Sequence, residues 1–348
     1  MRVVVVGASG NVGTSLLQSL AAEPAVDSVL GIARRVPGTS FPKTEWAAAD
    51  VKDSDLAPLF RGADAVVHLA WLIQPARDRA LTRAVNVDGS ERVFRAAAAA
   101  GAGALVYASS VGAYAPAPKD RRVDESWPTT GIPTSFYSRD KAAVERLLDR
   151  FEQEAPEVRT VRLRPGLIFK REAASEIRRL FAGPLLPSRL VDKRLIPILP
   201  LPERLAVQGV HSLDVGDAYR LAVAGDARGA FNIAAEPVLD RAALARLVGA
   251  RPVAVPERVV RAAAAASYRL HAQPSEPGWV DLALQAPLLD TSRARAELGW
   301  SPRHASDAAL DELLAGLRER AGMPTPPLDP SAGGPLRVRE FLTGVGSR

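Results

Sequence analysis

A tyrosine and a lysine stand four residues apart, at Tyr137 and Lys141, in a stretch that predicts a helix over residues 137–153. Residues at this spacing lie on one face of a helix. A phenol is a poor base at neutral pH because its pKa is ordinarily about 10. A cation within about 4–6 Å favours the phenolate and lowers that pKa by roughly 1–3 units. The pair therefore predicts a proton donor and acceptor that works near pH 7.

Two serines add a second chemical group. Ser109 and Ser110 follow a predicted strand over residues 104–108, and open α/β folds bind their ligands at the edge where such strands end. A serine hydroxyl across the site from the tyrosine can bind a substrate oxygen and orient it. A Tyr–Lys pair alone is an ordinary helix pair, so the catalytic interpretation also needs a cofactor-binding element elsewhere in the chain.

The N-terminal sequence MRVVVVGASGNVG supplies such an element. Arg2 is followed by four valines, and an uninterrupted β-branched run is typical of a strand buried on both faces of a parallel sheet. Gly7 allows a tight turn. Gly10 lets the backbone approach a pyrophosphate, and Gly13 lets the following helix press on the strand. The free N–H groups at the start of that helix favour phosphate.

Strand, glycine-rich turn and helix in this order form a dinucleotide-binding fingerprint, here with the spacing G-x-x-G-x-x-G. The alternative is a glycine-rich turn that binds no ligand. The residues of this segment that we expect at the cofactor are Gly7, Ser9, Gly10, Asn11, Val12 and Gly13.

The end of the second predicted strand, over residues 28–33, should meet the adenosine ribose. An acidic residue at this point hydrogen-bonds the ribose 2′-hydroxyl, but Arg34 and Arg35 stand here instead. Guanidinium groups bind phosphate through charge-assisted, bidentate hydrogen bonds. The pattern therefore predicts NADP(H) in preference to NAD(H). The alternative is that both arginines are exposed loop charges.

Strand and helix patterns alternate along the first two thirds of the chain, which predicts an α/β protein with a Rossmann-type doubly wound parallel sheet. Apolar runs predict strands over residues 2–6, 28–33, 46–50, 65–69, 104–108, 158–163 and 230–234. Helical patterns cover residues 56–60, 79–100, 137–153 and 214–224, and the remainder to about residue 318 is predicted to be helical.

The regularity fails beyond Phe169, which predicts a second, smaller and mainly C-terminal substrate-binding subdomain. Residues 170–205 contain five prolines, Pro184, Pro187, Pro197, Pro200 and Pro202, and suit an insertion that covers a substrate. The predicted division is a Rossmann domain over 1–169, with 206–235 returning to it, a substrate-binding subdomain over 170–205 and 236–322, and a Pro/Gly-rich linker and tail over 323–348.

Composition restricts the chemistry. The 348 residues include no cysteine, which excludes disulfides, thiolate catalysis and cysteine metal sites. Four scattered histidines do not predict a metal site. The net charge of +6 comes from arginines mixed with acidic residues, which favours an anion-binding cleft over a nucleic-acid partner. The N-terminal sequence is typical of a buried strand, and the chain contains no apolar run of eighteen residues. Both observations predict a cytoplasmic protein with no membrane partner.

Ten sequence segments together resemble the extended short-chain dehydrogenase/reductases of the NAD(P)-dependent epimerase/dehydratase group. They occur in order from Arg2 to about Pro302 and read GASGNVG, AADV (48–51), HLA (68–70), VNVDGS (85–90), VYASSVGAY (106–114), YSRDK (137–141), LRPGLIF (163–169), VHSLDVGDA (210–218), FNIA (231–234) and DTSRARAELGWSP. This agreement is specific for the family and says little about the substrate.

The resemblance implies a function for each matching residue. Tyr137 would be the acid/base, and Lys141 would lower its pKa and hold the nicotinamide ribose. Ser110, four residues before Tyr114, aligns with the catalytic Ser/Thr, with Ser109 as the second candidate. The remaining cofactor residues are Asp50 and Val51 at the adenine, Leu69, Ala70 and Trp71 along the pyrophosphate and ribose, and Pro165, Gly166, Leu167 and Ile168 beside the nicotinamide.

Several positions leave alternatives open. Asn86 matches a family asparagine whose role could be structural. Lys170 and Arg171 stand where many relatives have Gly-Pro, and would place positive charge either near the substrate or on the surface. The apolar segment 71–75 shows no obvious clamp for a nucleotide sugar. His68 and His211 are predicted to be structural.

The function predicted first is a reductase or dehydrogenase that passes a hydride between the nicotinamide and a carbonyl or secondary alcohol of a small-molecule substrate. The second is a nucleotide-sugar epimerase or dehydratase that retains NAD and uses the same three residues. The third is a dinucleotide-sensing regulator without catalysis, which the Tyr–Lys pair argues against. The resemblance also implies a homodimer formed through two helices.

Overall fold

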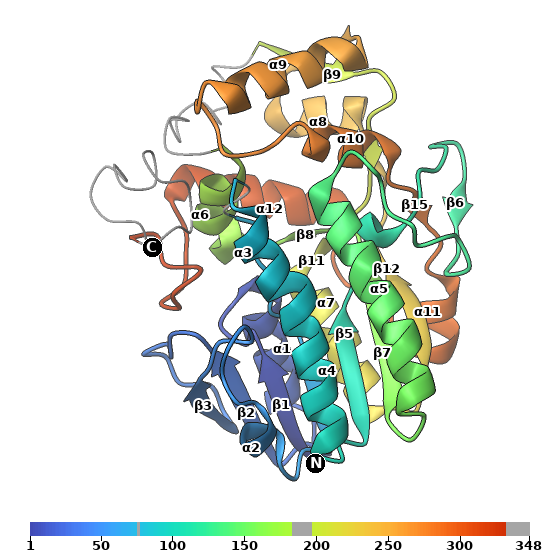
Figure 1. The fold of residues 1–348 in the computed structure, drawn as a ribbon. Helices are drawn as coiled ribbons and strands as arrows, with labels where there is room; N and C mark the ends of the chain where they lie inside the picture. Colours follow the sequence, from blue (N-terminus) through green and yellow to red (C-terminus); the bar gives the residue numbers. More distant parts are fainter. Residues whose placement is uncertain (75–76, 183–196, 332–348) are drawn as a thin grey trace.

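A sheet of seven parallel strands forms the centre of the molecule, in the order β12-β7-β5-β4-β1-β2-β3 (Figure 1). The computed structural model describes residues 1–74, 77–182 and 197–331. The sheet confirms the predicted Rossmann-type architecture. Its strands are β1 (Arg2–Val6), β2 (Ser28–Ala33), β3 (Thr44–Ala48), β4 (Ala65–His68), β5 (Ala104–Ala108), β7 (Arg159–Pro165) and β12 (Gly229–Ile233).

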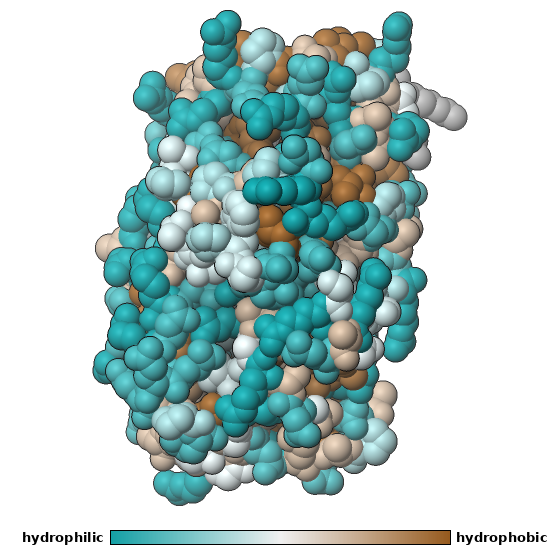
Figure 2. Space-filling view, turned by 90° about the vertical axis from the view of Figure 1, so that its right-hand side faces the viewer, coloured by the Kyte–Doolittle hydropathy of each residue, from teal (hydrophilic) through white to brown (hydrophobic). Residues whose placement is uncertain are grey.

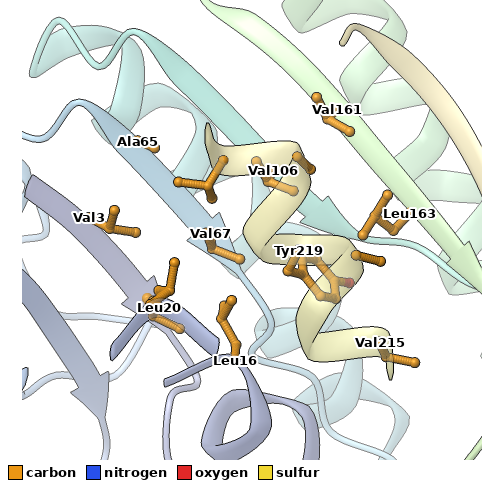
Figure 3. Close-up of a cluster of buried hydrophobic side chains, with 14 of the residues drawn as sticks. Val3, Leu16, Leu20, Ala65, Val67, Val106, Val161, Leu163, Val215 and Tyr219 are labelled. Carbon is orange, nitrogen blue, oxygen red and sulfur yellow. The ribbon is translucent and has the colours of Figure 1, made fainter. Parts of the chain in front are cut away.

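The valine run of β1 is central because helices cover both faces of the sheet. Val3 and Val5 belong to one core cluster together with residues of α1 (Asn11–Ala21) and α7 (Ser212–Ala224), part of which Figure 3 shows. Val4 and Val6 belong to the other cluster, on the opposite face. All four valines are fully buried, and burying a valine stabilises a fold by about 1.5–3 kcal/mol. The second face is covered by α2 (Ala57–Phe60), α4 (Gly89–Ala99) and α5 (Phe136–Glu154).

Short strand pairs and helices lie beyond the carboxyl edge of the sheet, in the upper half of Figure 1 and along its right-hand side. The strand pairs are β8 (Leu167–Phe169) with β11 (Gly209–His211), β6 (Arg122–Val123) with β15 (Leu288–Leu289), β10 (Ala206–Val207) with β13 (Leu239–Asp240), and β9 (Ile198–Pro202) with β14 (Arg251–Val255). The helices are α3 (Arg79–Arg83), α6 (Ala174–Ile177), α8 (Arg241–Val248), α9 (Glu257–Arg269), α10 (Gly278–Gln285) and α12 (Ser306–Glu319). The remaining helix, α11 (Ser292–Glu297), lies beside β12 at the edge of the sheet (Figure 1). Short helical turns are η1 (Ala84–Asp88), η2 (Val111–Ala113), η3 (Arg171–Ala173) and η4 (Arg178–Ala182).

The helix expected over 79–100 is confirmed as the consecutive helical segments α3, η1 and α4, and Asn86 lies in the π-helical turn η1. One prediction about secondary structure was wrong. The C-terminal part is not wholly helical, because β13, β14 and β15 lie within it. The strand β14 pairs with β9, which is distant in the sequence. Strand formation that depends on a distant partner cannot be predicted from the residues of the strand itself.

Some predicted features fall on residues that the structure does not describe, namely Pro75, Pro184, Pro187 and 332–348. The described part of the expected C-terminal linker packs against the protein, since Leu328 is fully buried. Over the described ranges, no helix combines the length and the apolar character needed to cross a bilayer. The face shown in Figure 2 is largely hydrophilic, with hydrophobic side chains gathered mainly in its upper half.

Candidate functional site

The glycine turn after β1 forms a close-fitting cradle at the carboxyl edge of the sheet. Gly7 has a φ of 89°, and a Cβ there would lie 2.6 Å from the backbone nitrogen of Ala70. A Cβ on Gly13 would lie 2.5 Å from the carbonyl oxygen of Ala8. The first atom that a Cβ on Gly10 would meet is 3.6 Å away, and no side chain caps α1 at this residue. The uncapped N–H groups of α1 therefore fit a pyrophosphate.

The other predicted cofactor residues follow strands that end at this same edge. Arg34 and Arg35 are exposed after β2, and Val51 is buried after β3. Ala70 follows β4 and touches the glycine turn. Gly166 lies between β7 and β8, where a Cβ would meet the carbonyl oxygen of Gln208 at 2.5 Å. The parallel topology thus gathers segments that are far apart in the sequence.

The predicted catalytic residues also come together. Tyr137 lies in the first turn of α5, which Ser135 caps by accepting from the Ser138 backbone N–H. The Ser110 hydroxyl accepts from the Gly112 N–H at 3.0 Å and lies close enough to the Tyr137 phenol to lower its pKa. Gly112 leaves room for this contact, because a Cβ there would lie 2.8 Å from Cε1 of Tyr137. The ammonium of Lys141 donates to the Ala108 carbonyl oxygen at 2.6 Å and lies 5.8 Å from the Tyr137 ring centroid.

The pKa values of this pair differ from the expectation. Burial raises the pKa of Tyr137 to about 12, and the Ser110 hydrogen bond offsets only part of that rise. Burial also takes the pKa of Lys141 well below its ordinary value, with Glu145 and Asp140 opposing the shift. The predicted lowering of the phenol pKa is therefore wrong in this structure, because desolvation is the largest influence on Tyr137. Tyr137 is protonated at neutral pH.

A buried carboxylate explains why the two serines differ. Ser109 donates to Oε1 of Glu145 at 2.5 Å, and Arg164 binds both oxygens of that carboxylate at 2.9 Å. Burial alone would raise the pKa of Glu145, but Arg164, Arg162 and Ser109 hold that pKa at about 2. Ser109 is therefore part of a structural network, whereas Ser110 contacts Tyr137.

Glu145 was not predicted as part of the site, although its spacing in the sequence places it on the same helix face as Tyr137 and Lys141. Glu145 follows Lys141 by four residues, as Lys141 follows Tyr137, so all three lie along one face of α5.

Replacing the two serines separately tests this division. Ser110→Ala is expected to lower kcat by about 100-fold, the scale found when one oriented hydroxyl or amide donor is removed from a reacting oxygen. Ser109→Ala should leave kcat within a few-fold and lower the free energy of unfolding by about 1–2 kcal/mol. Steady-state kinetics and urea unfolding measure both effects. A larger loss of kcat in Ser109→Ala would reverse the assignment, and Ser110→Thr is the control that retains a hydroxyl.

Asn86 has a clear structural role. Its amide accepts from the Leu72 N–H at 2.7 Å and donates to the Leu72 carbonyl at 2.8 Å. This two-point bond fixes the segment after β4, next to Ala70 and Trp71. Direct contact between Asn86 and a cofactor stays a prediction.

The structure also places Lys170 and Arg171, which the sequence left open, and the two histidines that were predicted to be structural. Lys170 is 4% exposed and donates to the hydroxyls of Thr14 and Ser15 at 3.2 Å, so its charge does not lie at the surface. Arg171 is at the surface and pairs with Glu319. His68 is fully buried against Phe94 and Tyr107, and His211 caps α7, in agreement with structural roles.

Two aromatic side chains lie beside Tyr137, Trp71, which was predicted at the cofactor, and Trp279, which was not predicted as part of the site. The Trp279 ring lies 4.9 Å from the Tyr137 ring, centroid to centroid, and the Trp71 ring lies 5.8 Å away. Trp71 also covers Lys141, whose ammonium is 3.5 Å from the indole centroid. Trp279 is remote from Tyr137 in the chain, so the sequence near either residue does not predict that their rings are in contact. No group of three acidic or histidine side chains within the described parts is placed to hold a metal ion.

Comparison with known proteins gives a family match. A model of the NAD dependent epimerase/dehydratase family matches residues 3–234. An uncharacterized protein of Mycobacterium tuberculosis is 27% identical over 330 residues, covering 93% of this chain and 31% of that protein. This chain therefore spans less than a third of that relative's length. The sterol-4-alpha-carboxylate 3-dehydrogenase of Saccharomyces cerevisiae is 26% identical over 252 residues, covering 68% of this chain and 66% of that protein.

Solved structures with the same fold carry NAD. A short-chain dehydrogenase/reductase superfamily protein from Agrobacterium tumefaciens, with bound NAD, is 25% identical with a TM-score of 0.69, covering 92% of this chain and 98% of that one. The UDP-glucose 4-epimerase of Thermus thermophilus, in complex with NAD, is 23% identical with a TM-score of 0.67, covering 91% and 99%.

Proposed function

The chain belongs to the NAD-dependent epimerase/dehydratase family, and on this premise we propose that it is an NAD(P)-dependent oxidoreductase of the extended short-chain dehydrogenase/reductase type. Its reaction is hydride transfer between the nicotinamide and a carbonyl or secondary alcohol of a small molecule. The observation that supports this most directly is the contact of Ser110 with Tyr137 above Lys141, at the sheet edge that holds the glycine turn. The curated yeast relative is named as a dehydrogenase.

Each side chain has a defined task in this proposal. When bound, the nicotinamide supplies or accepts a hydride at the substrate carbon. Ser110 orients the substrate oxygen, and Tyr137 gives that oxygen its phenolic proton during reduction. Lys141 is anchored on the Ala108 carbonyl and stabilises the phenolate that forms. The phenol of Tyr137 carries its proton at neutral pH, so the proton needed for reduction of a carbonyl is already in place.

The cofactor is proposed to lie along the carboxyl edge of the sheet. Its pyrophosphate would bind at Gly7–Gly13 and the start of α1, and its adenosine ribose near Arg34 and Arg35. NADP(H) is proposed over NAD(H), since two exposed arginines follow β2 where an acidic residue would favour NAD(H). Titration with NADPH and NADH, followed by a panel of carbonyl compounds and sugar nucleotides, tests the proposal. Binding without turnover of any carbonyl or alcohol would contradict it.

The double variant Arg34→Ala/Arg35→Ala tests the cofactor preference. It is expected to weaken NADPH at least about tenfold, since a hydrogen bond to a charged group contributes about 1.5–3 kcal/mol. NADH binding should change less than threefold, because NADH lacks the 2′-phosphate. Fluorescence titration measures both dissociation constants. Arg95→Ala, at an exposed arginine of α4 paired with Glu91, is the matched control. Equal losses for the two cofactors would show that these arginines do not contact a 2′-phosphate.

A nucleotide-sugar epimerase is the second candidate, because an NAD-bound epimerase shares this fold. An epimerase would keep NAD through purification and interconvert sugar nucleotides with no net change in nicotinamide absorbance. The reductase would consume its reduced cofactor in proportion to product.

We also propose that residues 170–205 and 236–322 form the substrate-binding part of a homodimeric, cytoplasmic protein. Phe181 and Trp279, one from each of these segments, touch each other beside Tyr137.

A further inference from the structure

Aromatic side chains cluster around the Tyr137 ring. Hydride and proton transfer do not by themselves require such a cluster. Trp279 lies against this ring at an interplanar angle of 38°, and Trp71 meets it edge-on at 73°. Phe181 stands edge-on to Trp279, with centroids 4.9 Å apart. Tyr137, both tryptophans and Phe181 are half-buried, so part of the cluster remains accessible to a ligand.

Trp279 is fixed to the start of the catalytic helix. A Cβ on Gly278, the first residue of α10, would lie 2.6 Å from the Thr134 carbonyl oxygen and 2.9 Å from Cα of Ser135. Glu276 accepts from the Phe136 N–H at 3.2 Å and pairs with Arg79. These contacts hold the two segments together, so the position of Trp279 relative to Tyr137 is set by the fold.

Two polar atoms in the cluster lack partners. The indole nitrogens of Trp71 and Trp279 are buried and make no hydrogen bond to any described residue. Of the other three tryptophans, Trp127 donates to the Ala115 carbonyl at 3.3 Å and Trp300 to the Asp214 carbonyl at 2.8 Å, whereas the indole nitrogen of Trp46 in β3 also lacks a partner among the described residues. A buried donor without a partner is costly, so two of them beside a reactive tyrosine point to a ligand that supplies acceptors.

The two arginines next to the cluster make contacts within the protein, although Nη1 of Arg79 is buried and makes no hydrogen bond to a described residue. The Arg79 guanidinium lies 3.5 Å from the Phe136 ring centroid and pairs with Glu276. Arg77 lies over the Tyr268 ring and donates to the Tyr268 carbonyl. These elements therefore offer a substrate the ring faces and two indole N–H donors, and Nη1 of Arg79 beside them is a further buried donor that no described residue satisfies.

We infer that Trp279 determines substrate specificity, and that the substrate is a flat, apolar ring ketone or alcohol that packs against its indole. This inference rests on the proposed function and narrows it to a substrate class. Aromatic side chains bind flat rings by offset or edge-to-face packing, and the indole N–H is available to an oxygen on that ring. A nucleotide sugar, which carries a charged diphosphate, is the competing class.

Two variants of Trp279 separate the contribution of its ring face to substrate binding from that of its N–H donor, and a third variant serves as a control. Trp279→Leu removes both, and Trp279→Phe keeps a ring without the N–H. Trp127→Phe is the matched control, since Trp127 already has a backbone partner. The probes are 1-tetralone as a flat ring ketone, 3-hexanone as an open-chain ketone, and UDP-glucose. Turnover is followed with NADPH, and calorimetry measures the binding of 1-tetralone.

Trp279→Leu is expected to raise the KM for 1-tetralone at least tenfold, with kcat within threefold and 3-hexanone kinetics unchanged. Trp279→Phe should give a smaller rise, and Trp127→Phe none. Equal changes for both ketones, an unchanged KM in Trp279→Leu, or turnover of UDP-glucose with no binding of 1-tetralone would overturn the inference. If no ketone is reduced, the proposed function fails, and calorimetry still decides the inference: 1-tetralone binding weakened by Trp279→Leu supports it, and no binding contradicts it.

Discussion

Replacing Tyr137 by phenylalanine is expected to lower kcat by about 10²–10⁴-fold, the range that positioned proton transfer contributes. The ring contacts with Trp71 and Trp279 do not involve the hydroxyl, so the variant should fold normally. The phenol gives its proton to the substrate oxygen in the proposed reaction, and water cannot replace it at the same position. NADPH should bind within about twofold of the native affinity. Stopped-flow kinetics and NADPH fluorescence titration measure the two quantities.

Tyr268→Phe is the matched control for this variant. Tyr268 lies at the end of α9, and its ring would stay under the Arg77 guanidinium after the hydroxyl is removed. Its kcat should match that of the native protein. Turnover retained in Tyr137→Phe would remove Tyr137 from the chemistry. Loss of NADPH binding together with turnover would instead mean that this tyrosine shapes the cofactor site.

Replacing Glu145 by glutamine is expected to lower the free energy of unfolding by about 3–5 kcal/mol, because removing one partner of a buried ion pair leaves the others uncompensated. Glu145 is fully buried and receives bonds from Arg162, Arg164 and Ser109. Arg164 also donates to the Tyr114 hydroxyl at 2.9 Å. The network therefore joins α5 to β7 directly beneath Lys141. Urea or guanidinium unfolding measures the change.

Glu152→Gln on the same helix is the control for the buried charge. Its carboxylate pairs with Arg162 at 2.8 Å but is 38% exposed, and exposed pairs contribute about 0–1 kcal/mol. Equal losses in the two variants would show that burial of Glu145 is not the cause.

The pKa of Glu145 gives a second readout. This pKa is about 2, below its ordinary value of 4.5, so its contribution to stability is present above about pH 4.5 and is lost as the pH falls toward 2. The native protein should therefore lose more stability over that interval than Glu145→Gln. Parallel curves would contradict the assigned charge state.

Much of the fold could be predicted because its signals are local. Four consecutive valines, Gly7 and the apolar pattern of α1 each act within one turn or one strand, and together they specify a strand–turn–helix unit. The same applies to Tyr137, Lys141 and Ser110, whose positions at a helix start and a strand end follow from neighbouring residues. Parallel topology then brings these segments to one edge without further information.

Other features depend on contacts between distant segments. Trp279 meets Tyr137 because Gly278 packs against residues 134 and 135, and β14 forms because β9 lies beside it. Neither partner is encoded in the nearby sequence.

The sequence by itself determined the family fold, the glycine cradle and the placing of Tyr137 and Lys141 on one helix face, the pair that we propose is catalytic. Only the tertiary structure decided which serine faces Tyr137, where Lys170 places its ammonium, and that the phenol pKa is high instead of low. The reason is that hydrophobic periodicity and turn chemistry are properties of short segments. Desolvation, in contrast, depends on every atom that the folded chain packs around a group.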